Sequence, residues 1–342
     1  MTGPLAVGVR VDIHLGRNVL AVDIDATAVK VEWSGERVVA GKLTYECPLE
    51  MLPDDPHDPL NNFGQRSHVV ALVETSRGIQ EVDLGWWLHT SWEEAGDHVT
   101  VTALDLMQVL EDDPMPWPSS PATGATVSVE AQRLSEHLPV TMEPGTPDPG
   151  LSPLIQWGTS RTEAIRDLCL THGLAYGVKA DGCLHIWQAS RDRNPVAAYT
   201  GRDLLIDAPR KALERRPNRW IVTGSPNQDK DAPPIRWTGT SVAEISPYDH
   251  RLYGWVTDHR EFSSATSEAA VKAASENYKQ EALSTRGKRS VEIVTDHRLE
   301  YGDIIAVHMD HGEVLVGRVI AYSMPVDDPG SVMRVDLEEV LW

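Results

Sequence analysis

The sequence predicts a mainly β protein in which an α/β module interrupts two stretches of antiparallel strands. Apolar and polar residues alternate through most of the first 104 residues, which is the period of half-buried strands. The same alternation returns from about residue 219 and continues to the end of the chain. Helix caps and a hairpin signal fall between these stretches. At 342 residues, the chain is long enough for two or three separate cores.

The first stretch predicts a small antiparallel barrel or sandwich, since short strands and turn signals alternate along it. Its first strand carries apolar side chains at every second position: Val7, Val9, Val11, Ile13 and Leu15. Further strand patterns follow, separated by turns and by the loop PDDPHDPLNN, at residues 19–24, 29–33, 37–46, 67–78, 79–93 and 97–104. Near Asp105 the apolar spacing changes to that of a short helix at residues 104–110.

An α/β module follows a Pro-rich connection, and a second Pro-rich stretch separates its two expected helices. We expect a helix at 129–138 and a second at 161–172, where Ser160 and Glu163 form a capping box and Gly173 ends the helix. Two strands then meet at Asp181-Gly182, a dipeptide that suits a tight hairpin turn.

The last stretch returns to strands, at residues 219–225 and around 235–241, and is interrupted by one long helix near 266–285. Possible N-caps and a C-terminal stop flank this helix: Ser263, Ser264, Thr266 and Gly287. Its apolar face contains mostly small residues, which predicts close packing on a sheet: Val271, Ala274, Tyr278 and Ala282. Alternating segments then continue to Trp342.

Composition excludes several classes of function. The formal net charge is -20, so the surface should repel nucleic acids and anionic membranes. No segment has the roughly 18 consecutive apolar residues of a membrane-spanning helix, and the N-terminus does not resemble a secretory signal. We therefore expect synthesis and assembly in a cytoplasm. Cys47, Cys169 and Cys183 are odd in number and irregularly spaced, which predicts buried thiols rather than disulfides or a zinc site.

Several motifs, taken in their order, resemble those of the tail hub or baseplate hub proteins of tailed bacteriophages. They are DHVTVTALDLMQVLED, TSRTEAIRDLCLTHGLAYGVKADGCLHIWQ, RPNRWIVTGS, SEAAVKAASENYKQEAL and RLEYGDIIAVHM. Each is weak alone, and the resemblance depends on their order across residues 95–310. Eleven Trp against two Phe is similar to minor tail proteins of phages that infect actinobacteria.

This resemblance implies two β-barrel-like domains at 1–112 and 194–342, with an inserted α/β domain at 113–193. It implies a homotrimeric ring that joins the sixfold tail tube or distal tail ring to threefold tip or fibre proteins in the virion tail. The expected partners are tail tube or distal tail proteins, the tape measure protein and tip or fibre proteins. DNA would pass through the lumen without specific binding, and an acidic lumen would not retain it. The chain ends directly after the last expected strand, so cell-wall hydrolysis or receptor binding is expected of another chain.

The candidate metal sites have simpler explanations. His297, His308 and His311 lie within fifteen residues, but the pattern predicts a β-hairpin that separates His297 from His311 by about a strand length. Asp12 and His14 share one face of a strand, which we interpret as the solvated face, and the same holds for Asp23 and Asp25. We predict neither a metal nor a cofactor.

The candidate catalytic and glycan-binding residues also have simpler explanations. Glu93 and Glu94 beside Trp92 could serve a peptidoglycan hydrolase, but adjacent carboxylates on a strand point apart. Trp86, Trp87 and Trp92 could form a glycan-binding platform, although neighbouring Trp side chains on a strand face opposite sides. His172, in the last helical turn, favours a structural interaction with the helix C-terminus. No nucleophile motif is present, so we predict no catalytic residues and no enzymatic activity.

Overall fold

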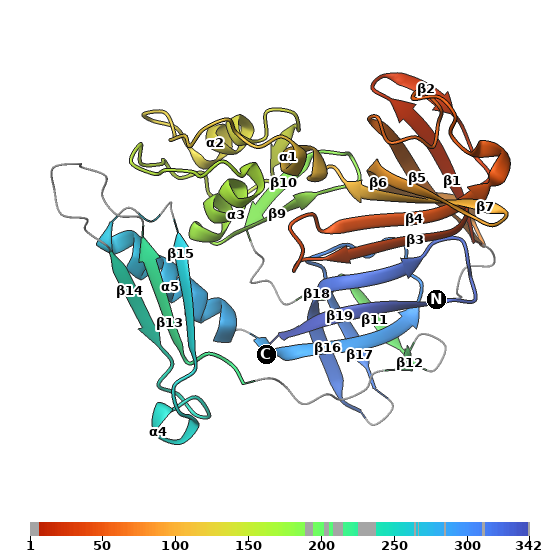
Figure 1. The fold of residues 1–342 in the computed structure, drawn as a ribbon. Coiled ribbons are helices and arrows are strands. Elements are labelled where there is room, and N and C mark those ends of the chain that lie inside the picture. Colours follow the sequence, from red (N-terminus) through yellow and green to blue (C-terminus); the bar gives the residue numbers. More distant parts are fainter. Residues whose placement is uncertain are drawn as a thin grey trace.

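The computed structural model describes residues 7–188, 194–201, 205–207, 215–224, 237–262, 265, 267–283, 285–309 and 312–340. Two β units lie side by side, and an inserted module covers one end of this pair (Figure 1). A small α/β unit lies on the side of the inserted module that faces away from the first β unit. Within the described residues, no helix has the length and apolar character needed to cross a membrane.

The first β unit has the strand order β3-β4-β7-β6-β5-β1-β2, with every pair antiparallel. Its buried positions alternate along β4 and β7, as the period of two predicts. The elements are β1 (Val7–Leu15), β2 (Asn18–Ala21), β3 (Thr27–Ser34), β4 (Gly41–Pro48), η1 (Leu49–Met51), β5 (Gln65–Thr75), β6 (Gly78–Ala95) and β7 (His98–Asp105).

The inserted module packs three helices against the sheet β8-β10-β9. Its elements are α1 (Gln108–Asp112), α2 (Val127–Leu134), β8 (Val140–Met142), α3 (Arg161–Thr171), β9 (Leu174–Val178) and β10 (Leu184–Gln188). The predicted cap of α3 is confirmed, because Ser160 Oγ accepts a hydrogen bond from Glu163 N at 3.2 Å. The hairpin at Asp181-Gly182 is also confirmed, since β9 and β10 pair antiparallel across it. The helix expected at 129–138 begins earlier and ends earlier than predicted, since α2 runs from Val127 to Leu134 with Ser135 as its C-cap.

The second β unit supplies the remaining six strands of the large sheet. They are β11 (Ala197–Thr200), β12 (Leu205–Asp207), β16 (Thr285–Val294), β17 (Ile304–His308), β18 (Val314–Pro325) and β19 (Val332–Val340). Strand β18 joins the units by pairing with β3, so thirteen strands form one sheet. Within the described residues no ladder closes either unit into a barrel.

The small α/β unit has a sheet of its own, β14-β13-β15, in which β13 and β15 are parallel. Its elements are β13 (Arg219–Gly224), β14 (Thr238–Val242), α4 (His250–Tyr253), β15 (Thr257–Phe262) and α5 (Glu268–Leu283). The long helix is confirmed as α5, although its expected N-caps Ser263, Ser264 and Thr266 lie outside the described residues. It packs so closely on the sheet that a Cβ at Gly239 would overlap the carbonyl oxygen of Val271. This sheet falls within residues 194–342, for which the resemblance implied one barrel-like domain.

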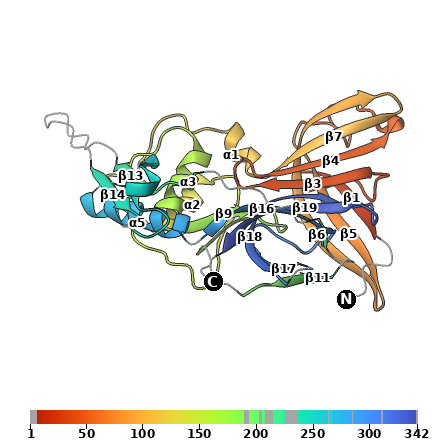
Figure 2. The ribbon, with the colours of Figure 1, turned by 90° about the horizontal axis from the view of Figure 1, so that it is seen from below.

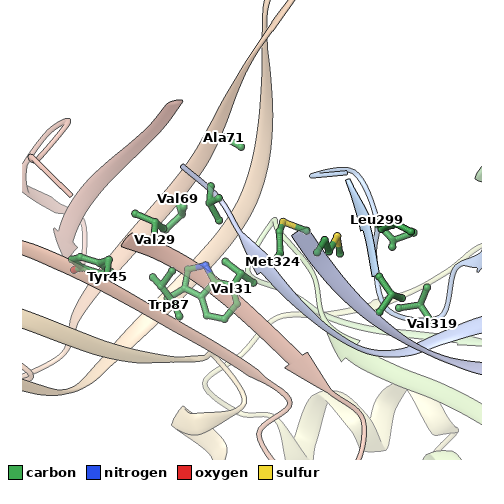
Figure 3. Close-up of a cluster of buried hydrophobic side chains, with 14 of the residues drawn as sticks. Val29, Val31, Tyr45, Val69, Ala71, Trp87, Leu299, Val319 and Met324 are labelled. Carbon is green, nitrogen blue, oxygen red and sulfur yellow. The ribbon is translucent and has the colours of Figure 1, made fainter. Parts of the chain in front are cut away.

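A single hydrophobic core extends from the first β unit into the second. Val31 and Trp87 lie in its first half, Leu299 and Val319 in its second, and Met324 lies close to Val31 between the two halves (Figure 3). Burial of this continuous apolar surface is the main force that holds the two units together. Figure 2 shows from below that the small unit and strands β4 and β7 lie at opposite ends of the molecule.

Candidate functional site

The seam between the two β units is an unbroken hydrogen-bonded ladder. Val31 in β3 pairs with Met324 in β18, and Trp33 pairs with Tyr322. Beyond the ladder, Val326 N donates to Val29 O at 2.8 Å and Val29 N donates to Asp327 Oδ1 at 3.0 Å. Because backbone hydrogen bonds and a shared core both cross this seam, the two units form a fixed pair.

The inserted module meets this pair at three aromatic side chains from distant parts of the chain. Trp33 stacks on Tyr301 with ring centroids 3.7 Å apart and planes inclined by 27°. Trp187 of β10 approaches the same Tyr301 edge-on, with centroids 6.5 Å apart. Lys179 Nζ lies 5.4 Å from the Trp187 ring, within the range of a cation–π interaction. This aromatic junction connects the first β unit, the inserted module and the second β unit.

Two cavities of about 120 and 190 Å³ flank the aromatic junction, and Trp33, Trp187 and Tyr301 line both. Each is smaller than the roughly 300 Å³ of an ordinary small-molecule site. The junction is therefore better explained as packing between units than as a binding pocket.

Asp105 is a buried carboxylate where the first β unit passes into the inserted module. It accepts hydrogen bonds from the backbone N–H groups of Gly41 and, at 2.8 Å, Met107. Burial raises the pKa of Asp105 to about 6, although these hydrogen bonds act to lower it. The side chain ties the β3–β4 connection to the start of α1, which is a structural role.

A second buried polar network lies inside the first β unit. Ser67 Oγ is 2.7 Å from His89 Nε2, Tyr45 Oη is 3.2 Å from the same nitrogen, and His89 Nδ1 donates to Asn61 O at 3.0 Å. Burial lowers the pKa of His89 to about 4, so the ring is neutral at pH 7. Ser67 and His89 are 0% and 2% exposed, which leaves this serine–histidine pair without access to a substrate. No sequence motif indicated this pair, because its members are distant in the chain.

The segment that contains His297, His308 and His311 includes a β-hairpin, as predicted. Strand β17 pairs with β18 so that His308 faces Val314, and His308 is exposed. His297 is buried, its Nε2 donates to Val326 O at 3.0 Å, and burial lowers its pKa. His311 lies outside the described residues. Among the described residues, no group of three or more His, Cys, Asp or Glu is arranged to hold a metal ion.

Asp12 and His14 make contacts with different partners and do not form a joint site. Asp12 accepts a hydrogen bond from Asp23 N at 2.8 Å, and its side chain is only 16% exposed, so this face of β1 is less solvated than predicted. The His14 ring packs edge-on against Trp86. Asp25 lies on the connection after β2.

The candidate glycan and hydrolase residues do not form a joint site. Trp87 is buried in the core, while Trp86 stacks on His68 with centroids 4.4 Å apart. Trp92 packs on the core of the first β unit and donates to Asn61 Oδ1 at 3.4 Å. Glu93 and Glu94 are both exposed and are adjacent on β6, so they point to opposite faces.

The cysteines and His172 occupy structural positions. Cys47 and Cys169 are buried, and burial raises the pKa of Cys47 to about 12. Cys183 is half-buried, and burial raises its pKa as well. His172 is the C-cap residue of α3, and burial lowers the pKa of its ring, so a favourable charge at the helix end is not its main contribution.

The fold is similar to those of three solved tail proteins, two of which come from prophages. A tail protein from Neisseria meningitidis MC58 superposes with a TM-score of 0.67 over 97% of both chains, at 15% identity. The 43 kDa tail protein of prophage MuSo2 from Shewanella oneidensis gives 0.60 at 12% identity, over 96% of this chain and 98% of that one. Prophage tail protein gp18 from Listeria monocytogenes EGD-e gives 0.56 at 10% identity, over 97% and 94%. No protein-family model matches the sequence, and no curated protein matches it either.

Proposed function

We propose that this chain is a structural component of a phage tail, a tail-tip or baseplate hub protein without enzymatic activity. The observation that carries the proposal is the similarity of fold to the Neisseria tail protein over nearly the full length of both chains. Such agreement at 15% identity indicates a shared architecture rather than one shared domain. The actinobacterial origin suggested by the Trp-rich composition stays a prediction.

In this proposal three copies form a ring. Each copy brings two β units that are fixed by the β3–β18 seam and act as barrel-like domains, so three copies present six units. Such a ring adapts the sixfold tail tube or distal tail ring to threefold tip or fibre proteins. We retain 1–112, 113–193 and 194–342 as the proposed domains, with the small α/β unit as a separate core within the last of them.

The proposed partners are tail tube or distal tail proteins, the tape measure protein and tip or fibre proteins, joined during assembly in the host cytoplasm. DNA would leave through the lumen of the ring, and the net charge of -20 favours its passage over its retention. Glycan binding and peptidoglycan cleavage gain no support from the described Trp and Glu residues, which form no joint site.

Electron cryo-microscopy of tails that carry this chain tests the proposal. We expect a threefold ring at the tail tip into which the chain fits, with its two β units in alternation around the axis. Density for the chain elsewhere in the particle, or as one isolated copy, would contradict it.

A further inference from the structure

The lower end of the small α/β unit carries an exposed apolar surface. Ile245, Leu252 and Trp255 are 62%, 93% and 46% exposed, and all three lie within eleven residues around α4. Figure 1 shows α4 projecting away from the rest of the molecule. We refer to residues 244–256, with Arg215, Arg216 and Arg219, as the basic tip. Large side chains gathered on such a surface are typical of an interface.

Hydrogen bonds and a ring stack support the backbone of the basic tip. The buried side chain of Asn218 donates to Tyr248 O and Gly254 O and accepts from Val256 N, each at 2.9 Å. Trp255 stacks flat on His250, with centroids 4.3 Å apart and planes inclined by 7°. A surface ordered before binding loses less conformational entropy when a partner is bound.

Its charge is opposite to that of the chain as a whole. Four arginines, Arg215, Arg216, Arg219 and Arg251, stand against two carboxylates, Glu244 and Asp249, in a chain of net charge -20. The guanidinium group of Arg219 lies 4.8 Å from the centre of the Trp255 ring, and the Arg251 side chain is 81% exposed. The tip therefore suits an acidic partner that also offers apolar side chains.

The far end of the first β unit has the complementary character. Residues 46–63 and 90–98, which we call the acidic end, contain eight carboxylates and neither Lys nor Arg. Pairing of Pro48 with His98 brings the start of η1 beside the β6–β7 hairpin, and Asn62 Nδ2 donates to Thr90 O at 3.0 Å. Phe63 is 66% exposed at this same end.

We propose that the basic tip of one copy docks on the acidic end of a second copy of this chain. The two surfaces lie at opposite ends of the molecule (Figures 1 and 2). The basic tip of one copy therefore cannot contact the acidic end of the same copy. Contacts between different surfaces of identical chains are head-to-tail, and they close into a ring when the rotation permits. The inference rests on the proposed trimeric ring and assigns its contact surfaces.

Cysteine cross-linking of the full chain tests this contact. In a Cys183→Ser background, Phe63→Cys and Leu252→Cys change exposed side chains, so folding should be retained. We expect efficient cross-linking when these two variants are mixed, and little when either is alone. Leu154→Cys, at a position 69% exposed on the inserted module, is the matched control for Phe63→Cys. A yield for the 63–252 pair no higher than for the 154–252 pair would overturn the contact.

Charge reversal gives an independent measurement. We expect Arg219→Glu with Arg251→Glu to weaken association at least about tenfold, and Glu93→Arg with Glu94→Arg to do the same. A chain that carries all four substitutions again presents opposite charges at every contact of the ring, so it should restore association. Arg37→Glu with Arg77→Glu makes the same charge change at exposed positions outside both surfaces and should leave association unchanged.

Loss of this contact is distinguishable from loss of the proposed function. A wild-type chain that forms a trimer without a 63–252 cross-link refutes only the contact surfaces. A chain that neither associates nor cross-links refutes both. Binding of the basic tip to anionic vesicles, without association of copies, would identify a lipid partner and also refute the contact.

Discussion

Trp33 stacks on Tyr301 at a centroid distance of 3.7 Å, although the two residues lie near opposite ends of the sequence. This contact, together with the edge-on approach of Trp187, is where all three large parts of the molecule meet. Its energetic coupling should therefore report how firmly the parts are joined.

We predict a coupling free energy of about 0.5 to 1.5 kcal/mol between Trp33→Ala and Tyr301→Ala in a double-mutant cycle, the range of aromatic pairs. Urea unfolding of the four proteins measures it. Tyr301→Phe keeps the ring and should keep the coupling. Additive effects of the two alanine substitutions would show that the stack contributes nothing of its own.

The buried neutral His89 predicts a loss of stability in acid. Its pKa is about 4 in the folded chain and 6.5 without burial, so between these values the unfolded chain binds the proton more readily. The free energy of unfolding contributed by His89 should fall by about 3 kcal/mol as the pH drops from 7 to 4. Chemical unfolding of wild type and His89→Gln at several pH values measures this difference. A difference that does not change with pH would contradict the assignment.

Asp105 should give the free energy of unfolding a pH dependence opposite in sign to that from His89. Its folded pKa of about 6 lies above the ordinary 3.8, so the folded chain binds the proton more readily between these values. Relative to Asp105→Asn, wild type should become more stable as the pH falls from 7 to 4. The variant should also lose about 1 to 3 kcal/mol at any pH, because an amide in place of the carboxylate leaves a backbone N–H of Gly41 or Met107 without its acceptor. The same unfolding series measures both effects, and a pH dependence of the same sign as for His89 would exclude this account.

The side chain of Asn218 should control the order of the basic tip. Asn218→Asp keeps an acceptor for Val256 N but places a carboxylate against the carbonyl groups of Tyr248 and Gly254. We expect faster hydrogen exchange at residues 243–256, with exchange in β3 and β18 unchanged. Arg251→Gln, which changes a side chain that is 81% exposed, is the comparison variant. Uniform acceleration across the chain would indicate global destabilisation instead.

Local features were predictable because local rules decide them. The Ser160 cap, the turn at Asp181-Gly182 and the α5 face at Val271, Ala274 and Tyr278 each depend on neighbours within a few residues. The hairpin around His308 followed from alternation alone. One face of β17 was still unexpected: Ile304 and Ala306 are buried as well as Ile305 and Val307, because a small second cluster with Val316 covers that face.

The long-range features had no local signal. Val31 pairs with Met324, and this pairing joins the two β units. In the sequence, both strands show only the usual alternation of apolar and polar residues, which does not indicate that they are partners. The parallel pairing of β13 with β15 was hidden for the same reason, since alternation does not specify a partner strand. The buried position of His89 depends on Tyr45 and Ser67 from other strands. The exposure of Leu252 had no signal in the sequence, because a Leu side chain is more often buried.

The assembled mass of the chain, measured alone by native mass spectrometry and again in purified tail tips, tests the central claim most directly. The account predicts a trimer in the tail tip, and in solution a concentration-dependent trimer that weakens with salt. A chain that remains a monomer both in solution and in the particle would contradict it.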